Sequence, residues 1–383
     1  MYVTRRLSFY LRDPSALSLP PPEGPNSGIL VIQDEEAQPT CCFGLCYSDQ
    51  VKNFPFPQNY NLNVRYTTQA GQHQSVSVNR VAFIPVLNQP LSSNQYYCIE
   101  RAGKNKGKAY INSKEEDKTT CCFCNCINDF EPAPLAPQDT YQQFEIQRRD
   151  WGGFVGKSTT SDGYPPNFLR RKGWRLYTTS PLKFDLNEAQ GVDNTLRFRL
   201  PDSSNISLSQ KTSQPVVVGK WYCPFMFIKD GAVQDQFDSS RYYEMTLQQK
   251  WEQIFACENN NNNEGNAPVI VDVAIENEVV KIGSEKIMYG DDNLVDGVMW
   301  FGNVGLSSVI IERIKWEEER FGWISGSQKE VKIKRVEEFR GAGEWKKFGC
   351  YVLVESFVLK RMNGSLLLTY EFRHTQHVTS KWE

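Results

Sequence analysis

Cysteine is the residue type in this 383-residue chain with the widest range of possible chemistry, and eight of its eleven cysteines precede residue 127. Four thiolates brought together suit a structural zinc ion, and a thiol beside a base suits nucleophilic or redox chemistry. If two cysteine-bearing hairpins meet about a two-fold axis, four side chains could converge on zinc. These predicted metal ligands are Cys42, Cys46, Cys122 and Cys126.

A simpler interpretation treats the same cysteines as small core side chains. On a strand, Cys122, Cys124 and Cys126 share one face, and free cysteine is among the most buried residue types. The spacing also lacks the turn that a zinc knuckle places between close cysteines. The sequence therefore predicts buried thiols and no cofactor, with zinc or redox use of the cluster as the alternative.

Other catalytic groups are sparse. The three histidines have no local signature with a cysteine or serine, and His374 and His377 are interpreted as a solvated segment beyond a strand rather than as a metal pair. The glycine-rich run 152–158 fails as a phosphate loop, because Trp151 stands where that motif needs glycine. This inventory favours a non-enzymatic protein and leaves a metal-dependent or thiol enzyme as the rival.

The segment from Arg148 to Arg175 is the best predicted binding surface. It holds seven basic residues against two acidic ones, interleaved with aromatic residues. Basic groups beside stacking rings suit single-stranded nucleic acid, phosphorylated ligands or acidic lipid headgroups, although strands with arginines facing water and rings facing the core give the same pattern. The predicted partner is an unknown protein or anionic ligand, contacted by Arg148, Arg149, Lys157, Arg170, Arg171, Lys172, Trp174 and Arg175.

Two internal repeats suggest which elements position these groups. Thr40-Cys41-Cys42-Phe43 recurs eighty positions later as Thr120-Cys121-Cys122-Phe123, and the register holds for about thirty residues without a gap. Each copy follows a Glu-Glu segment and predicts a β-hairpin. A second repeat relates residues 273–289 to 352–370, where Asn363-Gly364 is a strong hairpin-turn signal.

The expected fold class is α+β and predominantly β, with duplicated β-hairpin units followed by strand-turn-strand-helix units. Helices are predicted over 246–255, where Thr246 and Gln249 form a capping box, and over 310–321. All nine tryptophans follow the Pro-rich stretch 131–137, which predicts a domain boundary there. Residues 1–135 are expected to form a Cys-rich duplicated β domain with a Pro-rich N-terminal arm. Residues 136–383 are expected to form a Trp-rich β domain with two or three helices and internal repeats.

Composition sets the remaining expectations. The chain is 40% apolar and 23% charged, as in soluble globular proteins, and its formal charge of −2 gives no whole-protein attraction to nucleic acid or anionic membranes. Neither a signal peptide nor a membrane-spanning helix is expected, because no apolar stretch is long enough. The predicted location is the cytoplasm or nucleus, where the cysteines would be reduced.

Several stretches resemble one plant family. They are the opening Met1–Arg5, Pro14–Gly28 and Cys41–Cys46, the interior Val218–Tyr222, and the end Phe348–Glu383. They are similar to a family known only as a domain of unknown function, number 1262 in that naming. The resemblance implies a plant protein of a multi-copy family associated with stress or pathogen responses, without an assigned reaction. The combined prediction is a binding or scaffold protein, with a membrane-acting defence protein whose strands insert on oligomerisation as a further alternative.

Overall fold

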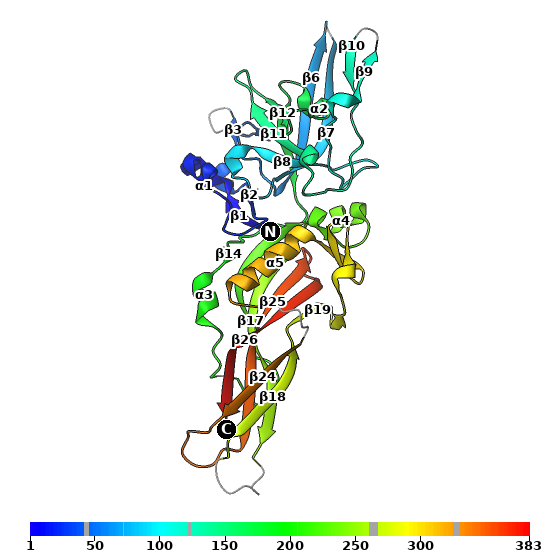
Figure 1. Ribbon diagram of the computed structural model, residues 1–383. Helices are drawn as coiled ribbons and strands as arrows, with labels where there is room; N and C mark the ends of the chain where they lie inside the picture. The colour runs from blue at the N-terminus through cyan, green and yellow to red at the C-terminus, as the bar shows by residue number, and fades with distance from the viewer. Residues whose placement is uncertain (42–45, 72, 122–123, 205, 260–266, 325–329) are drawn as a thin grey trace.

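The computed structural model describes residues 1–41, 46–71, 73–121, 124–204, 206–259, 267–324 and 330–383. The molecule is elongated, with a compact lobe at one end and long strands that run to the other end (Figure 1). Its N-terminus lies near the middle of the long axis, and its C-terminus lies close to the end of the long strands. Strands dominate, so the prediction of a mainly β fold is confirmed.

The compact lobe is a seven-stranded sheet that curls back on itself. In spatial order the strands are β12 (Phe154–Ser158), β11 (Gln143–Arg148), β8 (Gln95–Glu100), β7 (His73–Pro85), β6 (Tyr60–Ala70), β13 (Arg175–Pro181) and β5 (Gln50–Val51). Closure comes from Phe154 N, which donates to Trp174 O at 2.8 Å, and from Gly173 N, which donates to Phe154 O at 2.9 Å. Successive side chains of a strand point to opposite faces of the sheet. Aromatic and aliphatic side chains on the inner face of the lobe form a separate core.

A nine-stranded sheet forms the body. Its strands are β2 (Gly28–Ile32), β1 (Tyr2–Arg6), β15 (Val216–Pro224), β17 (Tyr242–Glu258), β25 (Lys347–Arg361), β26 (Leu366–Trp382), β19 (Glu278–Ile282) and β20 (Glu285–Ile287), with β14 (Gly191–Val192) paired to β15. Helix α5 (Ser308–Arg320) covers one face (Figure 1). The largest core joins this face to the outer side of the lobe, because Ile84 and Ile99 of β7 and β8 belong to the same cluster as Ile310 and Phe357.

The remaining elements are small. A four-stranded sheet holds β16 (Ile228–Lys229), β23 (Val304–Ser307), β22 (Val298–Phe301) and β21 (Leu294–Val295), while β18 (Val269–Glu276) pairs with β24 (Glu330–Glu337) against the far part of the body. The short helices are α1 (Leu7–Arg12), α2 (Asn167–Arg170), α3 (Asn194–Arg199) and α4 (Val233–Ser239). None of the helices in the described ranges has the length and apolar character needed to cross a membrane.

The two cysteine-bearing segments each form a hairpin, but the hairpins are not copies. In β3 (Thr40–Cys41) and β4 (Cys46–Tyr47), Cys41 pairs with Cys46, whereas in β9 (Lys118–Cys121) and β10 (Cys124–Ile127), Cys121 pairs with Cys124. The register therefore differs by two residues. The hairpins are separate two-stranded sheets, and β3 lies well apart from β9 and β10 (Figure 1), so they do not meet about a two-fold axis.

One predicted helix is a strand. Residues 246–255 lie within β17, which pairs with β15 on one side and β25 on the other. Leu247 and Trp251 sit on one face of this strand, a spacing that fits period two as well as it fits a helix, and pairing on both edges decides the outcome. The second predicted helix is confirmed as α5. The Asn363-Gly364 turn is also confirmed, because it joins β25 to β26.

Sheet membership does not follow a division at residue 135. Strands β11, β12 and β13 lie beyond that position, yet β11 pairs with β8 and β13 pairs with β6. The first strand, β1, pairs with β15 of the body rather than with the cysteine hairpins. The lobe is therefore built mainly from residues 50–181, and the N-terminal residues are an integral part of the body.

Candidate anion-binding surface

The predicted basic segment runs from the end of β11 through β12 and α2 to the start of β13. Arg148 ends β11 and donates from Nη1 to Asn53 Oδ1 at 2.6 Å. Lys157 on β12 and Lys172 before β13 are exposed. Trp151, in the turn between β11 and β12, has 93% of its surface exposed, which leaves an indole ring free to contact another molecule.

Two members of that segment serve the lobe itself. Arg170 forms an ion pair with Asp129 at 2.6 Å and donates to Pro165 O at 2.8 Å. Trp174 is fully buried, and its indole N–H donates to Leu169 O at 2.9 Å. The expectation that Trp174 contacts a partner is corrected, because strand alternation turns this side chain inward and Arg175 outward.

Arg175 lies directly opposite Arg65 of β6 on the outer side of the sheet. Like charges in directly opposed positions destabilise a strand pair, and neither guanidinium forms an ion pair with a carboxylate of the described residues. An aromatic ring contacts one member of this pair, and a second ring contacts a neighbouring arginine. Arg65 lies 4.4 Å from the Tyr177 ring centroid, and Arg171 lies 5.2 Å from that of Tyr66.

The positive charge continues along the same face toward the body. Arg80 of β7 is opposite Asn63 of β6, two residues from Arg65, and Arg101 donates from Nη2 to Asn63 Oδ1 at 3.0 Å. Burial, followed by repulsion from Arg241 and Arg80, lowers the pKa of Arg101 to about 10. The arginine face is defined here as Arg65, Arg80, Arg101 and Arg175.

Sequence reasoning found only Arg175 of this face. Its other three members lie on β6, on β7 and directly after β8, outside the basic segment. The available signal was the alternation of Arg65 with the apolar Val64 and of Arg80 with Val81, which marks both arginines as outward-facing on strands.

A second charged group is sealed inside the body. His374 of β26 places Nε2 2.8 Å from Glu318 Oε2 and 3.4 Å from Glu355 Oε2, and Arg197 Nε donates to Glu355 Oε1 at 2.9 Å. All four side chains have at most 2% of their surface exposed. The interpretation of His374 as part of a solvated segment is therefore wrong, because β26 runs through the core beside β25 and α5.

The sealed group behaves as an ion network. Burial by itself would lower the pKa of His374, but hydrogen bonds to Glu318 and Glu355 raise it to about 9. Burial, followed by repulsion from Glu355, raises the pKa of Glu318 to about 8. Burial would also raise the pKa of Glu355, but bonds from His374 and Arg197 lower it to about 2.

Three of these side chains could in principle hold a metal ion. Donor atoms of Glu318, Glu355 and His374 all lie within 4.8 Å of one another. The guanidinium of Arg197 fits poorly with a cation there, because it donates to Glu355 and Glu318 and brings its own positive charge to them. With both carboxylates bonded and no exposed surface, this group is suited to holding α3, α5, β25 and β26 together rather than to receiving a substrate.

One family model matches part of this chain. Residues 23–123 match the model of a family described as "Protein of unknown function (DUF1262)". That stretch contains Arg65, Arg80 and Arg101 of the arginine face. No curated protein matches the chain. Among solved structures, the crystal structure of Cry35Ab1 is similar with a TM-score of 0.47 and 13% sequence identity, over 85% of this chain and 90% of that chain.

The structure also bears on part of the cysteine prediction. Cys42 and Cys122 lie outside the described residues, Cys46 is disulfide-bonded, and Cys126 is an exposed free thiol. The predicted set of four thiolates is corrected at Cys46, because a sulfur in a disulfide is not a thiolate and does not bind zinc as one. The expectation of reduced cysteines is wrong at the same position.

Three of the free cysteines elsewhere lie in the cores. Cys98, Cys223 and Cys350 are buried. Burial raises the pKa of Cys223 to about 11 and that of Cys350 to about 11, so both stay protonated near neutral pH. These three thiols are structural side chains rather than nucleophiles.

Proposed function

We propose that this chain is a non-enzymatic binding protein that holds an acidic partner protein on its arginine face. The observation that carries the proposal is the direct opposition of Arg65 and Arg175 without a carboxylate partner among the described residues. An arrangement that costs folding free energy is explained when a bound anionic group offsets the repulsion.

The chemistry of the face suits a protein partner. Arginine presents a planar fork that binds carboxylates through two parallel hydrogen bonds, and arginine, tyrosine and tryptophan are enriched at protein interfaces. Within this surface, the ring of Tyr177 already contacts Arg65. Because the whole chain has a formal charge of −2, attraction of an acidic partner depends on this local cluster.

The test compares binding of a labelled polyglutamate peptide and a labelled single-stranded RNA by fluorescence anisotropy. Arg65→Gln combined with Arg175→Gln is expected to weaken polyglutamate binding by about tenfold or more, since two charge-assisted contacts are lost. Lys157→Gln is the matched control, because Lys157 of β12 is an exposed cation on the same lobe but lies opposite Glu145 of β11. Equal loss in the control, or tight binding of RNA only, would contradict an acidic protein partner.

The cellular setting is proposed from the family resemblance. The protein would act in the cytoplasm or nucleus of plant cells, in responses to stress or pathogens. A metal-dependent or thiol enzyme is the first rival, and it predicts stoichiometric zinc or an activity lost in Cys122→Ser. A membrane-acting defence protein is the second rival, and it predicts dye release from liposomes.

A further inference from the structure

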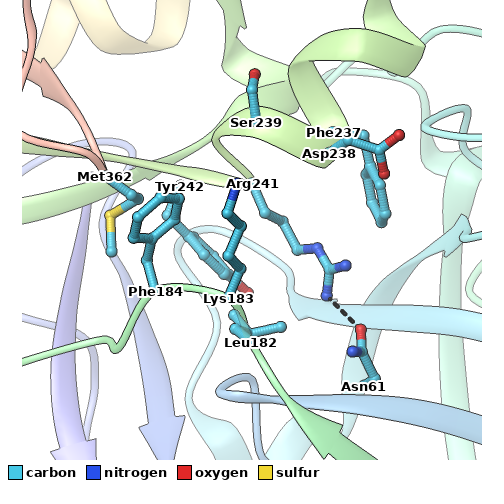
Figure 2. A pocket seen from close by; sticks show the side chains of 10 residues that line it. All are labelled: Asn61, Leu182, Lys183, Phe184, Phe237, Asp238, Ser239, Arg241, Tyr242 and Met362. Carbon is cyan, nitrogen blue, oxygen red and sulfur yellow. Dashed lines mark hydrogen bonds between the residues drawn. The ribbon is translucent and has the colours of Figure 1, made fainter.

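A cavity of about 200 Å³ lies where the lobe meets the body (Figure 2). Its walls come from segments that are far apart in sequence. Asn61 belongs to β6, the segment 182–184 follows β13, residues 237–239 end α4, and Met362 follows β25. Arg241, which directly precedes β17, and Tyr242, its first residue, complete the lining.

Arg241 is the central polar group of this cavity. Its Nη1 donates to Asn61 Oδ1 at 3.0 Å, and its guanidinium carbon lies 4.3 Å from the ring centroid of Phe237. Its Nε is buried without a hydrogen-bond partner, and burial lowers the pKa of the side chain. Burying a guanidinium without a paired carboxylate costs folding free energy. A bound anion from solution would offset that cost, so the site is suited to one.

The surrounding charges keep this cavity positive. Lys183 lines it beside Arg241, is exposed, and forms no ion pair within the described part of the chain (Figure 2). Arg101 of the arginine face also lies near enough to Arg241 to influence its own protonation. Asp238 is the one acidic side chain in the lining, and it already forms an ion pair with Lys106.

The other side of the cavity is apolar. Figure 2 shows the rings of Phe184 and Tyr242 close to the thioether of Met362, on the opposite side of Arg241 from Asp238. We propose that this cavity binds a small organic oxyanion, with a carboxylate or phosphate head on Arg241 and Lys183 and a single ring or short aliphatic body against Phe184 and Tyr242. The volume is below the roughly 300 to 1,000 Å³ of sites for drug-sized ligands, which favours a one-ring molecule.

This small-molecule site goes beyond the proposed protein partner. It shares strand β6 with the arginine face but uses different side chains, so either proposal can fail without the other. Two head groups, carboxylate and phosphate, share the chemistry that Arg241 and Lys183 would recognise. The probes below separate them.

The test is isothermal titration calorimetry of the full chain with benzoate, phenyl phosphate, inorganic phosphate and benzyl alcohol. Benzoate or phenyl phosphate is expected to bind with a dissociation constant of about 1 mM or lower, and the tighter of the two identifies the head group. Benzyl alcohol, which has the ring without the charge, and inorganic phosphate, which has the charge without the ring, are expected to bind at least about tenfold more weakly. The proposal would be overturned if either control compound bound as tightly as benzoate or phenyl phosphate. It would also be overturned if neither benzoate nor phenyl phosphate gave a heat of binding up to about 10 mM.

Variants locate the site. Lys183→Met is expected to weaken binding by about tenfold without affecting folding, because Lys183 is exposed, and Phe184→Ala to weaken it by a similar factor. Arg241→Met should abolish binding, with circular dichroism used to show that the variant is folded. Arg175→Met is the matched control, since it removes one arginine from the lobe outside this cavity. Unchanged binding in Lys183→Met, or loss of binding in Arg175→Met, would overturn the assignment.

Discussion

His374 Nε2 lies 2.8 Å from Glu318 Oε2, and neither side chain has exposed surface. The two residues stand on β26 and α5, 56 positions apart, so their contact ties the covering helix to the long strands of the body. Their ionisation is therefore linked to folding, because the unfolded chain leaves both groups in water.

This linkage predicts that stability falls as pH rises above neutral. The pKa of His374 is raised from 6.5 to about 9, so its contribution is complete below pH 6.5 and is lost as pH rises through 9. The pKa of Glu318 is raised from 4.5 to about 8, so the folded protein also holds a proton there that the unfolded chain has released. Both pKa shifts therefore lower the free energy of unfolding as pH rises. Together they predict that the free energy of urea unfolding is roughly 4 to 5 kcal/mol lower at pH 9 than at pH 6.5.

The matched variants are His374→Gln and His73→Gln, because His73 is exposed. His374→Gln is expected to be less stable at pH 6.5 and to show a smaller loss between pH 6.5 and 9, whereas His73→Gln keeps the wild-type profile. A free energy of unfolding that stays constant or rises over this interval in the wild type would contradict the assigned ion network.

Arg197→Met should destabilise the body strongly. The substitution keeps the apolar stem but leaves Glu355 and Glu318 buried with one fewer cationic partner, a type of change that costs about 3 to 5 kcal/mol. Arg199→Met is the control, since Arg199 is exposed in the same helix and should change stability by less than about 0.5 kcal/mol. Chemical denaturation measures both. A similar small effect in the two variants would show that Arg197 is not essential to the network.

Arg175→Thr is expected to stabilise the lobe while weakening partner binding. It removes one of two like charges in directly opposed positions and introduces a residue with high strand propensity, for a gain of roughly 0.2 to 1 kcal/mol. Lys157→Thr should instead lower the stability of the lobe, because Lys157 lies opposite the acidic Glu145. Thermal unfolding of the two variants compares them directly, and destabilisation by Arg175→Thr would count against a strained arginine pair.

The two tryptophans near the basic segment should behave differently. Trp174→Ala removes a fully buried side chain from the core of the lobe and is expected to cost about 3 to 5 kcal/mol. Trp151→Ala should change stability by less than about 0.5 kcal/mol and should abolish the fluorescence component most accessible to iodide, because this ring is almost wholly exposed. Strong destabilisation by Trp151→Ala would place that ring in a packed environment.

Local signals in the sequence predicted two elements correctly. The Asn363-Gly364 turn and the helix over 310–321 depend on residues close in sequence. The same local reasoning failed at 246–255, where an apolar spacing of four residues fits one face of a strand as well as a helix. Pairing of β17 with two neighbouring strands outweighed the capping-box signal there.

The sequence by itself therefore determined a strand-rich chain with a basic, aromatic segment and few catalytic groups. Tertiary structure alone decided that Arg65 faces Arg175 across 110 positions and that His374 is enclosed with Glu318 and Glu355. The physical reason is strand register. A shift of one residue moves every side chain of a strand to the other face, and register between distant strands is fixed by the packing of the whole sheet rather than by neighbouring residues.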